Sequence, residues 1–304
     1  MPQDFSNRRS APLLTRYNAR MTARPLIDVG TLARRNGSAG LVVVDCRFSL
    51  TDGAAGRAAY DRGHVPGARY AHLDDDLSRR PSPAEGRHPL PDPARFAATL
   101  GNWGITDGDT VVCYDEGSGG IAARLWWLLR HLGHRDCAVL DGGFAAWQEA
   151  GLPDERETPS WTVRRYEPRS TGAQRVVATA DLAARLAAGG LLVDARAAPR
   201  YRGEQEPIDP VAGHVPGARN RPFASNLTAK GRFRPAAELR AELLDLLGGR
   251  EPSALIAMCG SGVTACHLLL ALEWADLKGG ALYAGSWSEW IRDPSRPIKT
   301  GPEP

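Results

Sequence analysis

Four short sequence patterns each occur twice in this chain of 304 residues, and both sets follow the same order. They are an apolar run ending in Asp-x-Arg (41–47 and 191–196), the turn Gly-His-Val-Pro-Gly-Ala-Arg (63–69 and 213–219), an apolar run before a glycine-rich loop (111–115 and 255–259), and a Gly/Trp segment (142–147 and 285–290). A similar spacing separates the members of every pair. Ordered repeats of this kind indicate a duplicated domain.

Each copy begins with an apolar run and then alternates helical patterns with short strand-like runs. Strands separated by helices predict an α/β fold, in which a mainly parallel sheet has helices on both faces. We draw the two tandem domains at residues 25–155 and 173–298. The expected linker is the polar stretch 151–173, which contains Pro153, Pro159, Pro168 and Gly172.

Cys259 follows a short apolar run and precedes two glycines and a helical pattern that starts near Thr264. This order predicts a strand, a tight loop and a helix. Backbone N–H groups and the positive end of a helix dipole converge on such a loop, and both favour a thiolate over a thiol. We therefore interpret Cys259 as a nucleophile, whereas Cys113 and Cys266 lie inside apolar runs and are expected to be buried hydrophobic residues.

Composition excludes several classes of protein. A net charge of +3 is too small to predict nucleic-acid binding, and the apolar runs are too short for a membrane span. The five cysteines show no metal-ligand spacing and no disulfide density, which favours a reducing, cytoplasmic location. Residues 1–24 are rich in arginine, a composition compatible with an organelle transit peptide, but we expect a disordered leader.

Several polar or aromatic residues have structural interpretations. His64 and His214 lie in proline- and glycine-containing turns and are expected to be hydrogen-bonded structural residues. Asp45 and Asp194 are expected to pair or cap locally, next to arginines two residues on. Four tryptophans in apolar patterns are expected in the core: Trp126, Trp127, Trp147 and Trp290. By contrast, the long polar loop 74–93 has no counterpart in the second copy, and loops of that length are often functional.

Taken together, the paired Asp-x-Arg and Gly-His-Val-Pro-Gly elements, the aspartate at the first loop (Asp115) and the cysteine at the second resemble the two-domain rhodanese sulfurtransferases. The resemblance spans nearly the whole chain. It implies a rhodanese-like fold in both halves, with catalysis in the second half only. Asp115 agrees with this, because a carboxylate cannot form a persulfide.

The loop Cys259-Gly-Ser-Gly-Val-Thr264 looks like that of the 3-mercaptopyruvate sulfurtransferases, whereas thiosulfate sulfurtransferases typically place Arg and Lys after the cysteine. Carried over by position, the family's proton relay maps to Ser261, His88 and Asp74. The substrate-binding residues implied are Arg200 and the loop residues Gly260, Gly262, Val263 and Thr264.

One position departs from the family pattern. Where mercaptopyruvate sulfurtransferases commonly have a second substrate arginine, this chain has Ile208. We expect another arginine to substitute for it, and the candidates are Arg202, Arg219 and Arg221. Among these we include Arg202 in the predicted site.

The resemblance implies transfer of a sulfane sulfur from 3-mercaptopyruvate, through a Cys259 persulfide, to cyanide or to a thiol that is small or thioredoxin-like. Neither a metal nor an organic cofactor is expected. The alternatives are a thiosulfate sulfurtransferase and a non-enzymatic sulfur-carrier or regulatory module. A cysteine phosphatase is disfavoured, because the residue six positions beyond Cys259 is Ala265 rather than the arginine that a phosphoryl transition state requires.

Overall fold

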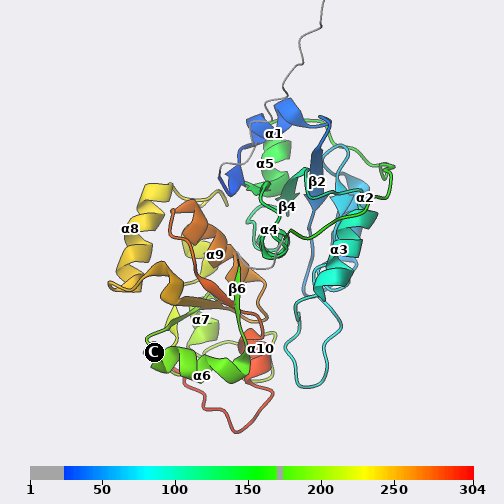
Figure 1. Ribbon diagram of the computed structural model, residues 1–304. Helices are drawn as coiled ribbons and strands as arrows, with labels where there is room; N and C mark the ends of the chain where they lie inside the picture. The colour runs from blue at the N-terminus through cyan, green and yellow to red at the C-terminus, as the bar shows by residue number, and fades with distance from the viewer. Residues whose placement is uncertain (1–23, 170–173) are drawn as a thin grey trace, which may run out of the picture.

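The computed structural model describes residues 24–169 and 174–304 (Figure 1). The expected leader therefore lies outside the described residues, except for Arg24. The Arg24 guanidinium lies over the ring of Trp274, 5.4 Å from its centroid. Among the helices described, none is long and apolar enough to cross a membrane.

The first domain contains one parallel sheet of five strands in the order β1-β5-β4-β2-β3. Its elements are β1 (Leu26–Ile27), α1 (Val29–Arg35), β2 (Leu41–Asp45), α2 (Ala55–Arg62), β3 (Arg69–Tyr70), α3 (Pro93–Asn102), β4 (Thr110–Tyr114), α4 (Ala122–His131), β5 (Cys137–Leu140) and α5 (Gly143–Glu149). The central strands β2, β4 and β5 are continuous apolar runs because helices cover both of their faces.

The second domain repeats this topology, with the strand order β6-β10-β9-β7-β8. Its elements are β6 (Arg175–Val177), α6 (Thr179–Ala187), β7 (Leu191–Asp194), α7 (Ala198–Tyr201), β8 (Arg219–Asn220), the 3₁₀ turn η1 (Phe223–Asn226), α8 (Ala236–Leu247), the 3₁₀ turn η2 (Pro252–Ala254), β9 (Leu255–Met258), α9 (Thr264–Trp274), β10 (Ala281–Tyr283) and α10 (Ser286–Trp290). All its paired strands are parallel. The predicted α/β fold with two tandem domains is confirmed.

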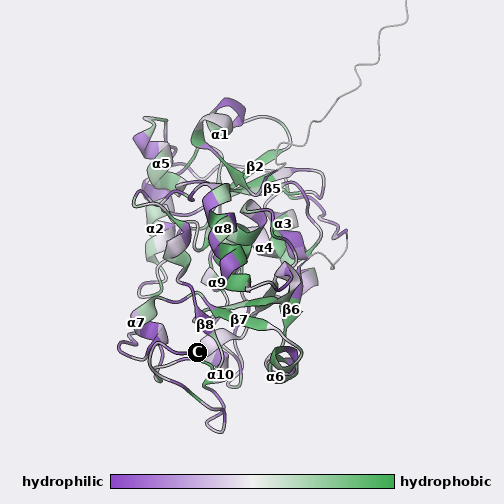
Figure 2. Ribbon diagram, turned by 90° about the vertical axis from the view of Figure 1, so that its left-hand side faces the viewer, coloured by the Kyte–Doolittle hydropathy of each residue, from purple (hydrophilic) through white to green (hydrophobic). Residues whose placement is uncertain are grey.

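Alternate residues of each strand enter different hydrophobic cores. In β2, Val43 joins a core with α1, α2 and α5, whereas Val42 and Val44 join a larger core that extends through α3, α4, α8 and α9 into the second domain. A third core lies between the second sheet and α6, α7 and α10. Figure 2 draws β2, β5 and β7 mainly in the hydrophobic colour. The two domains therefore share their largest core.

Two hydrogen bonds cross between the domains in a reciprocal way. Arg124 of α4 donates from Nη1 to the carbonyl oxygen of Gly262 (3.1 Å). His267 of α9 hydrogen-bonds through Nε2 to the carbonyl oxygen of Ser118 (3.0 Å). Gly262 and Ser118 each lie four residues after the end of a matching strand, in the loops that contain Cys259 and Asp115. Each domain thus contacts the corresponding loop of the other.

The repeated motifs have matching structural roles. His64 and His214 are fully buried and stack on Tyr60 and Tyr201, with ring centroids 3.8 Å apart in both pairs. Each Nδ1 lies 2.8 Å from the carbonyl oxygen of the same tyrosine. The expectation that these histidines are hydrogen-bonded is confirmed.

The two Asp-x-Arg motifs form matching buried ion pairs. The Arg47–Asp45 and Arg196–Asp194 pairs both measure 2.6 Å. Arg47 and Arg196 also donate to the carbonyl oxygens of the turn glycines at 63 and 213. These pairs therefore fix each strand end to the turn that follows.

One prediction about the core was wrong in part. Trp126, Trp127 and Trp147 are buried, but Trp290 is only partly buried. Its Nε1 donates to the carbonyl oxygen of Pro297. Trp290 is the last residue of α10 and packs at the edge of the third core, so its side chain is only partly covered.

The first domain extends two segments beyond its sheet. In the polar stretch after residue 155, Arg164 donates to the carbonyl oxygen of Gly101, so this part of the connection packs on α3. The long loop between β3 and α3 has no helix or strand from 74 to 92 and reaches the second domain. There Arg292 donates from Nε to the carbonyl oxygen of Glu85 (3.2 Å). This second contact places the Arg87-His88 segment beside the Cys259 loop.

Candidate active site

Cys259 lies in the loop between β9 and α9, at the carboxyl edge of the second sheet, where parallel α/β sheets bind ligands. Its side chain and backbone are 2 % exposed. The backbone N–H of Cys259 donates to Ser286 Oγ (3.1 Å), and Ser286 Oγ donates to the carbonyl oxygen of Tyr283 (2.8 Å). Ser286 has a φ of 52°, a conformation that is uncommon for a non-glycine residue. The start of α10 therefore supports the Cys259 backbone directly.

The loop after Cys259 requires glycine for steric reasons. Gly262 has a φ of 77°, and a Cβ at this position would lie 2.4 Å from the carbonyl oxygen of Ala284. Within the described parts of the chain, no acceptor contacts the backbone N–H groups of residues 260–264. These amides lie beside the N-terminus of α9 and next to the sulfur, an arrangement that can accept an anion.

Ser261, His88 and Asp74 form a connected chain of polar contacts. Ser261 Oγ lies 2.7 Å from His88 Nδ1, and His88 Nε2 lies 3.1 Å from Asp74 Oδ1. Ser261 and His88 are both buried, whereas half of the Asp74 side chain is exposed. The chain joins the Cys259 loop to the first domain and ends at solvent.

The charges in this chain are set by burial and hydrogen bonding. Burial lowers the pKa of His88, although Asp74 opposes this effect. The hydrogen bond with His88 lowers the pKa of Asp74. A neutral His88 that donates from Nε2 to an ionised Asp74 leaves Nδ1 free to accept the Ser261 proton. Ser261 can therefore pass protons to and from His88.

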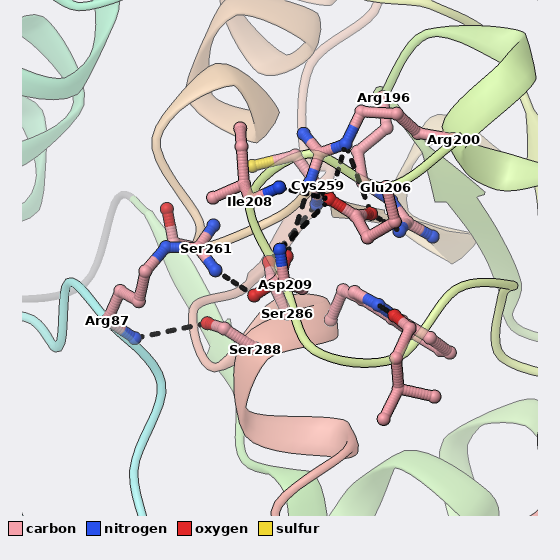
Figure 3. A network of polar contacts seen from close by, with 12 residues as sticks. Arg87, Arg196, Arg200, Glu206, Ile208, Asp209, Cys259, Ser261, Ser286 and Ser288 are labelled. Atoms are coloured by element: carbon pink, nitrogen blue, oxygen red, sulfur yellow. Dashed lines mark hydrogen bonds and ion pairs between the residues drawn. The ribbon is translucent and has the colours of Figure 1, made fainter. Parts of the chain in front are cut away.

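A network of arginines and carboxylates adjoins the loop (Figure 3). Arg200 donates to Glu206 from Nε and Nη2, at 2.7 to 3.1 Å, and from Nη2 to Asp209 Oδ2 at 3.1 Å. Arg196 contacts Glu206 at 3.3 Å, and a negative charge at Cys259 would raise the pKa of Arg196. Burial raises the pKa of Asp209, although Arg87 opposes this effect. Arg200 is thus held beside the loop by two carboxylates.

Two arginines of the first domain also reach this region, and the sequence interpretation missed both. The Arg87 guanidinium pairs with Asp209. Arg124 is fully buried, and in addition to its bond to Gly262 it donates to the carbonyl oxygens of His88 (3.0 Å) and Leu77 (3.3 Å). A signal existed for each: Arg87 precedes His88 directly, and Arg124 is the only charged residue in the apolar run from 121 to 129.

The structure places the candidates named to replace an arginine at position 208 in contacts outside the Cys259 loop. Arg202 pairs with Glu204 at the surface (2.7 Å). Residues two apart on a helical turn point to opposite sides, so Arg200 faces the loop and Arg202 faces away. Arg219 donates to the carbonyl oxygen of Leu246, and Arg221 donates to Glu242 and Asn226. Arg219 and Arg221 therefore contact α8, and Arg221 also contacts η1, rather than the Cys259 loop.

The other cysteines differ from Cys259 in their surroundings. Cys113 and Cys266 are fully buried, as expected, and burial raises the pKa of Cys266 to about 12. Residues 24–169 and 174–304 contain no group of three or more His, Cys, Asp or Glu side chains placed to hold a metal ion. Cys259 is thus the cysteine that combines an open amide loop with nearby cations.

Comparison with known proteins places this geometry in a family. The model of the rhodanese-like domain matches residues 28–150 and 178–293. The chain is 48 % identical to a protein of Pseudomonas aeruginosa named "Probable 3-mercaptopyruvate sulfurtransferase", over 92 % of this chain and 100 % of the relative. It is 37 % identical to the thiosulfate sulfurtransferase of Rattus norvegicus, over 88 % of this chain and 92 % of that one.

A solved structure agrees with these relatives. The 3-mercaptopyruvate sulfurtransferase from Leishmania major superposes with a TM-score of 0.78 at 33 % identity, covering 89 % of this chain and 76 % of that one. The two sequence relatives and this structural neighbour are thus all named as sulfurtransferases.

Proposed function

Because the chain belongs to the rhodanese-like family and is a sulfurtransferase, we propose that its sulfur donor is 3-mercaptopyruvate and that Cys259 carries the sulfur as a persulfide. Sulfurtransferases of this family use a sulfur donor and a thiol or cyanide acceptor. The reaction then proceeds in two half-reactions with the persulfide between them.

In the first half-reaction, the Cys259 thiolate attacks the donor's sulfur. A sulfur–sulfur bond forms, the carbon–sulfur bond breaks, and the electron pair leaves with the carbon fragment as the enolate of pyruvate. The donor's thiol loses its proton, and the enolate carbon gains one. In this proposal Ser261 and His88 carry the proton from the donor's thiol to the enolate carbon, and Asp74 stabilises His88 when it is protonated.

In the second half-reaction, a thiolate or cyanide attacks the outer sulfur of the persulfide. The Cys259 thiolate leaves, and the product is a new persulfide or thiocyanate. The free amides of residues 260–264 can hold the anionic persulfide between the two steps. We propose a small thiol or a thioredoxin-like dithiol as the acceptor, since neither requires a cofactor.

The observation that carries the choice of donor is the contact between Ser261 Oγ and His88 Nδ1, at 2.7 Å. A donor that is itself a thiol needs its proton moved, and this pair supplies an acid and base beside the sulfur. Thiosulfate transfers its sulfur without any proton, so it makes no use of the relay.

Thiosulfate remains the alternative donor, and one observation favours it. The loop itself supplies no cation at Gly260 or Ser261, but guanidinium groups from Arg87 and Arg200 adjoin Gly260. A dianion therefore finds positive charge here despite the loop sequence. A pure sulfur carrier is less well supported, because a carrier needs no proton relay.

The test is to measure kcat/KM for 3-mercaptopyruvate and for thiosulfate on one preparation with one acceptor. We expect a preference for 3-mercaptopyruvate of at least about tenfold, the contribution of roughly one good interaction in the transition state. Mass spectrometry of Cys259 after donor alone should show the added sulfur. A preference for thiosulfate would overturn the choice of donor, and an unmodified Cys259 would overturn the persulfide.

A further inference from the structure

The segment 85–88 of the first domain is fixed against α10 of the second. The backbone N–H of Arg87 donates to Ser288 Oγ (3.1 Å), as Figure 3 shows. Gly86 is so close to α10 that a Cβ on it would lie 2.6 Å from the carbonyl oxygen of Gly285. Neither contact involves the relay residues. Arg87 is therefore held at the domain interface by its own backbone.

The Arg87 guanidinium lies in the space that a side chain at position 260 would need. A Cβ built on Gly260 would be 2.9 Å from Arg87 Nη2. The same Cβ would be 3.6 and 3.7 Å from the two terminal nitrogens of Arg200. Two guanidinium groups, one from each domain, thus flank the residue that follows Cys259.

Arg87 also has a donor without a partner among the described residues. Its Nη1 pairs with Asp209, which accepts from Arg200 as well. Its Nε is buried and has no hydrogen-bond partner in the described parts of the chain. A buried charged donor without a partner is costly, and such a group in a folded protein calls for an explanation, for example a bound ligand. This Nε belongs to the guanidinium that adjoins Gly260.

Resting on the function proposed above, we propose that Arg87 is the second donor-binding cation of the site and is supplied by the first domain. It provides the charge that relatives of the mercaptopyruvate type supply from position 208, which is Ile208 here. With Arg200, it forms a composite subsite for the anionic end of the donor, a carboxylate or a sulfonate group next to the transferable sulfur. Asp209 holds the two guanidinium groups at a fixed spacing between turnovers.

This assignment changes how selectivity is achieved. If both cations stand beside the loop rather than in it, the charge of the subsite does not distinguish a carboxylate from a sulfonate. Discrimination between the two donors then depends on the relay from Ser261 to His88. Loss of Arg87 should accordingly weaken the binding of both donors to a similar extent.

The experiment compares Arg87→Met, which keeps the aliphatic stem, with Arg80→Met, which removes the same charge from an exposed residue of the same loop. We expect Arg87→Met to raise KM for 3-mercaptopyruvate and for thiosulfate by about 10 to 100-fold, with kcat at saturation and KM for the thiol acceptor nearly unchanged, because a uniform binding interaction is removed. Arg80→Met should stay within about twofold of the parent protein. Adding Ile208→Arg to Arg87→Met should recover at least about tenfold, the value of one charge-assisted contact.

Two results would overturn the assignment. One is an Arg87→Met protein whose donor KM values match those of the parent. The other is a fall in kcat confined to 3-mercaptopyruvate, without rescue by Ile208→Arg, which would mean that Arg87 only positions His88. Thermal unfolding identifies a variant that fails to fold, and in that case Arg87→Lys replaces it in the same comparison.

A binding measurement separates this proposal from the proposed function. Calorimetric titration with pyruvate, the carboxylate product, needs no turnover, and Arg87→Met should raise its Kd by about tenfold or more. An unchanged Kd would overturn the role of Arg87 even in an active enzyme. A parent protein that fails to turn over 3-mercaptopyruvate would overturn the donor, while the thiosulfate KM and the pyruvate Kd would still test Arg87.

Discussion

The loops that follow β4 and β9 share a backbone arrangement and differ in what fills them. In the first, the N–H of Phe144 donates to the carbonyl oxygen of Asp115; in the second, the N–H of Trp287 donates to that of Cys259. The Asp115 carboxylate accepts from the amides of residues 117, 119, 121 and 122, at 2.8 to 3.2 Å. The backbone amides of residues 260–264 beside Cys259 have no acceptor within the described residues.

The difference shows how one scaffold can serve two purposes. A loop of converging amides needs negative charge, and the first domain supplies it permanently from its own side chain. The second domain has Cys259 at the equivalent position, and on the proposed mechanism its loop amides hold the thiolate and then the persulfide. The first loop therefore has an acceptor for its amides within its own domain, whereas the loop beside Cys259 keeps its amides for the reacting sulfur.

The largest expected effect separates the two loops by chemistry. Cys259→Ser should lower kcat/KM for every donor by about 10⁴-fold or more, since removal of a nucleophile leaves only binding effects. Asp115→Asn, the matched change at the first loop, should leave kcat/KM within about threefold. Steady-state assays with both donors measure this. Transfer retained by Cys259→Ser would end the mechanism.

Next in size is the effect of emptying the first loop. Asp115→Ala should lower the free energy of unfolding by about 3 kcal/mol, because four amide donors lose their acceptor in a largely buried site. Asp115→Asn, which keeps one acceptor oxygen, should lose roughly half as much. Urea unfolding measures both. A loss below about 0.5 kcal/mol for Asp115→Ala would show that the carboxylate does not hold its loop.

A smaller effect tests whether the second loop depends on proton transfer. Ser261→Ala should lower kcat for 3-mercaptopyruvate by about 100-fold, because it breaks the link between the donor and His88. For thiosulfate, kcat should remain within about threefold, since no proton moves. Equal losses for both donors would assign Ser261 to binding rather than to the relay.

The smallest effect concerns the histidine that joins the loops. Burial lowers the pKa of His267 from 6.5 to about 4. Between pH 6.5 and pH 4 the unfolded chain binds more protons at His267 than the folded chain does. The stability of the folded protein therefore suffers no loss from this residue above about pH 6.5, and it falls as the pH is lowered toward 4. Between pH 7 and pH 5 the loss from this residue should be roughly 2 kcal/mol.

His267→Gln, which can still donate to Ser118, removes that titration. Urea unfolding at several pH values should show a shallower decline for the variant than for the parent. His88 and His134 also have lowered pKa values because of burial, so some decline should remain in the variant. Identical slopes in the two proteins would mean that His267 is not the group responsible.

Much of this architecture could be predicted from the sequence. The repeated Asp-x-Arg and His-Val-Pro-Gly motifs predicted two α/β domains, and in both copies these motifs form the same buried ion pair and the same contact with the turn. Cys259 was identified from its strand-loop-helix setting. The resemblance named Ser261, His88 and Asp74, which the fold brings into contact from different domains.

The arginines show where sequence reasoning was insufficient. Arg202 is close to Arg200 in sequence but points away from the loop, because side chains two residues apart on a helical turn point to opposite sides. Arg87 reaches Gly260 across the domain interface, and nothing in a single sequence specifies that interface. The structure was therefore needed both for the direction of Arg202 within one helical turn and for the contact of Arg87 with the other domain.

The reciprocal bonds from Arg124 to Gly262 and from His267 to Ser118 join equivalent elements of the two domains, a helix of each to the loop of the other. They have the form of an isologous interface, in which the same surface patch is used by both partners. The molecule is thus organised as a homodimer within a single polypeptide, whose halves have since diverged. Only one of the two equivalent loops contains a cysteine, and the other domain places His88 and Arg87 beside that loop. On the proposed mechanism neither half contains a whole active site, so catalysis would require the fused pair.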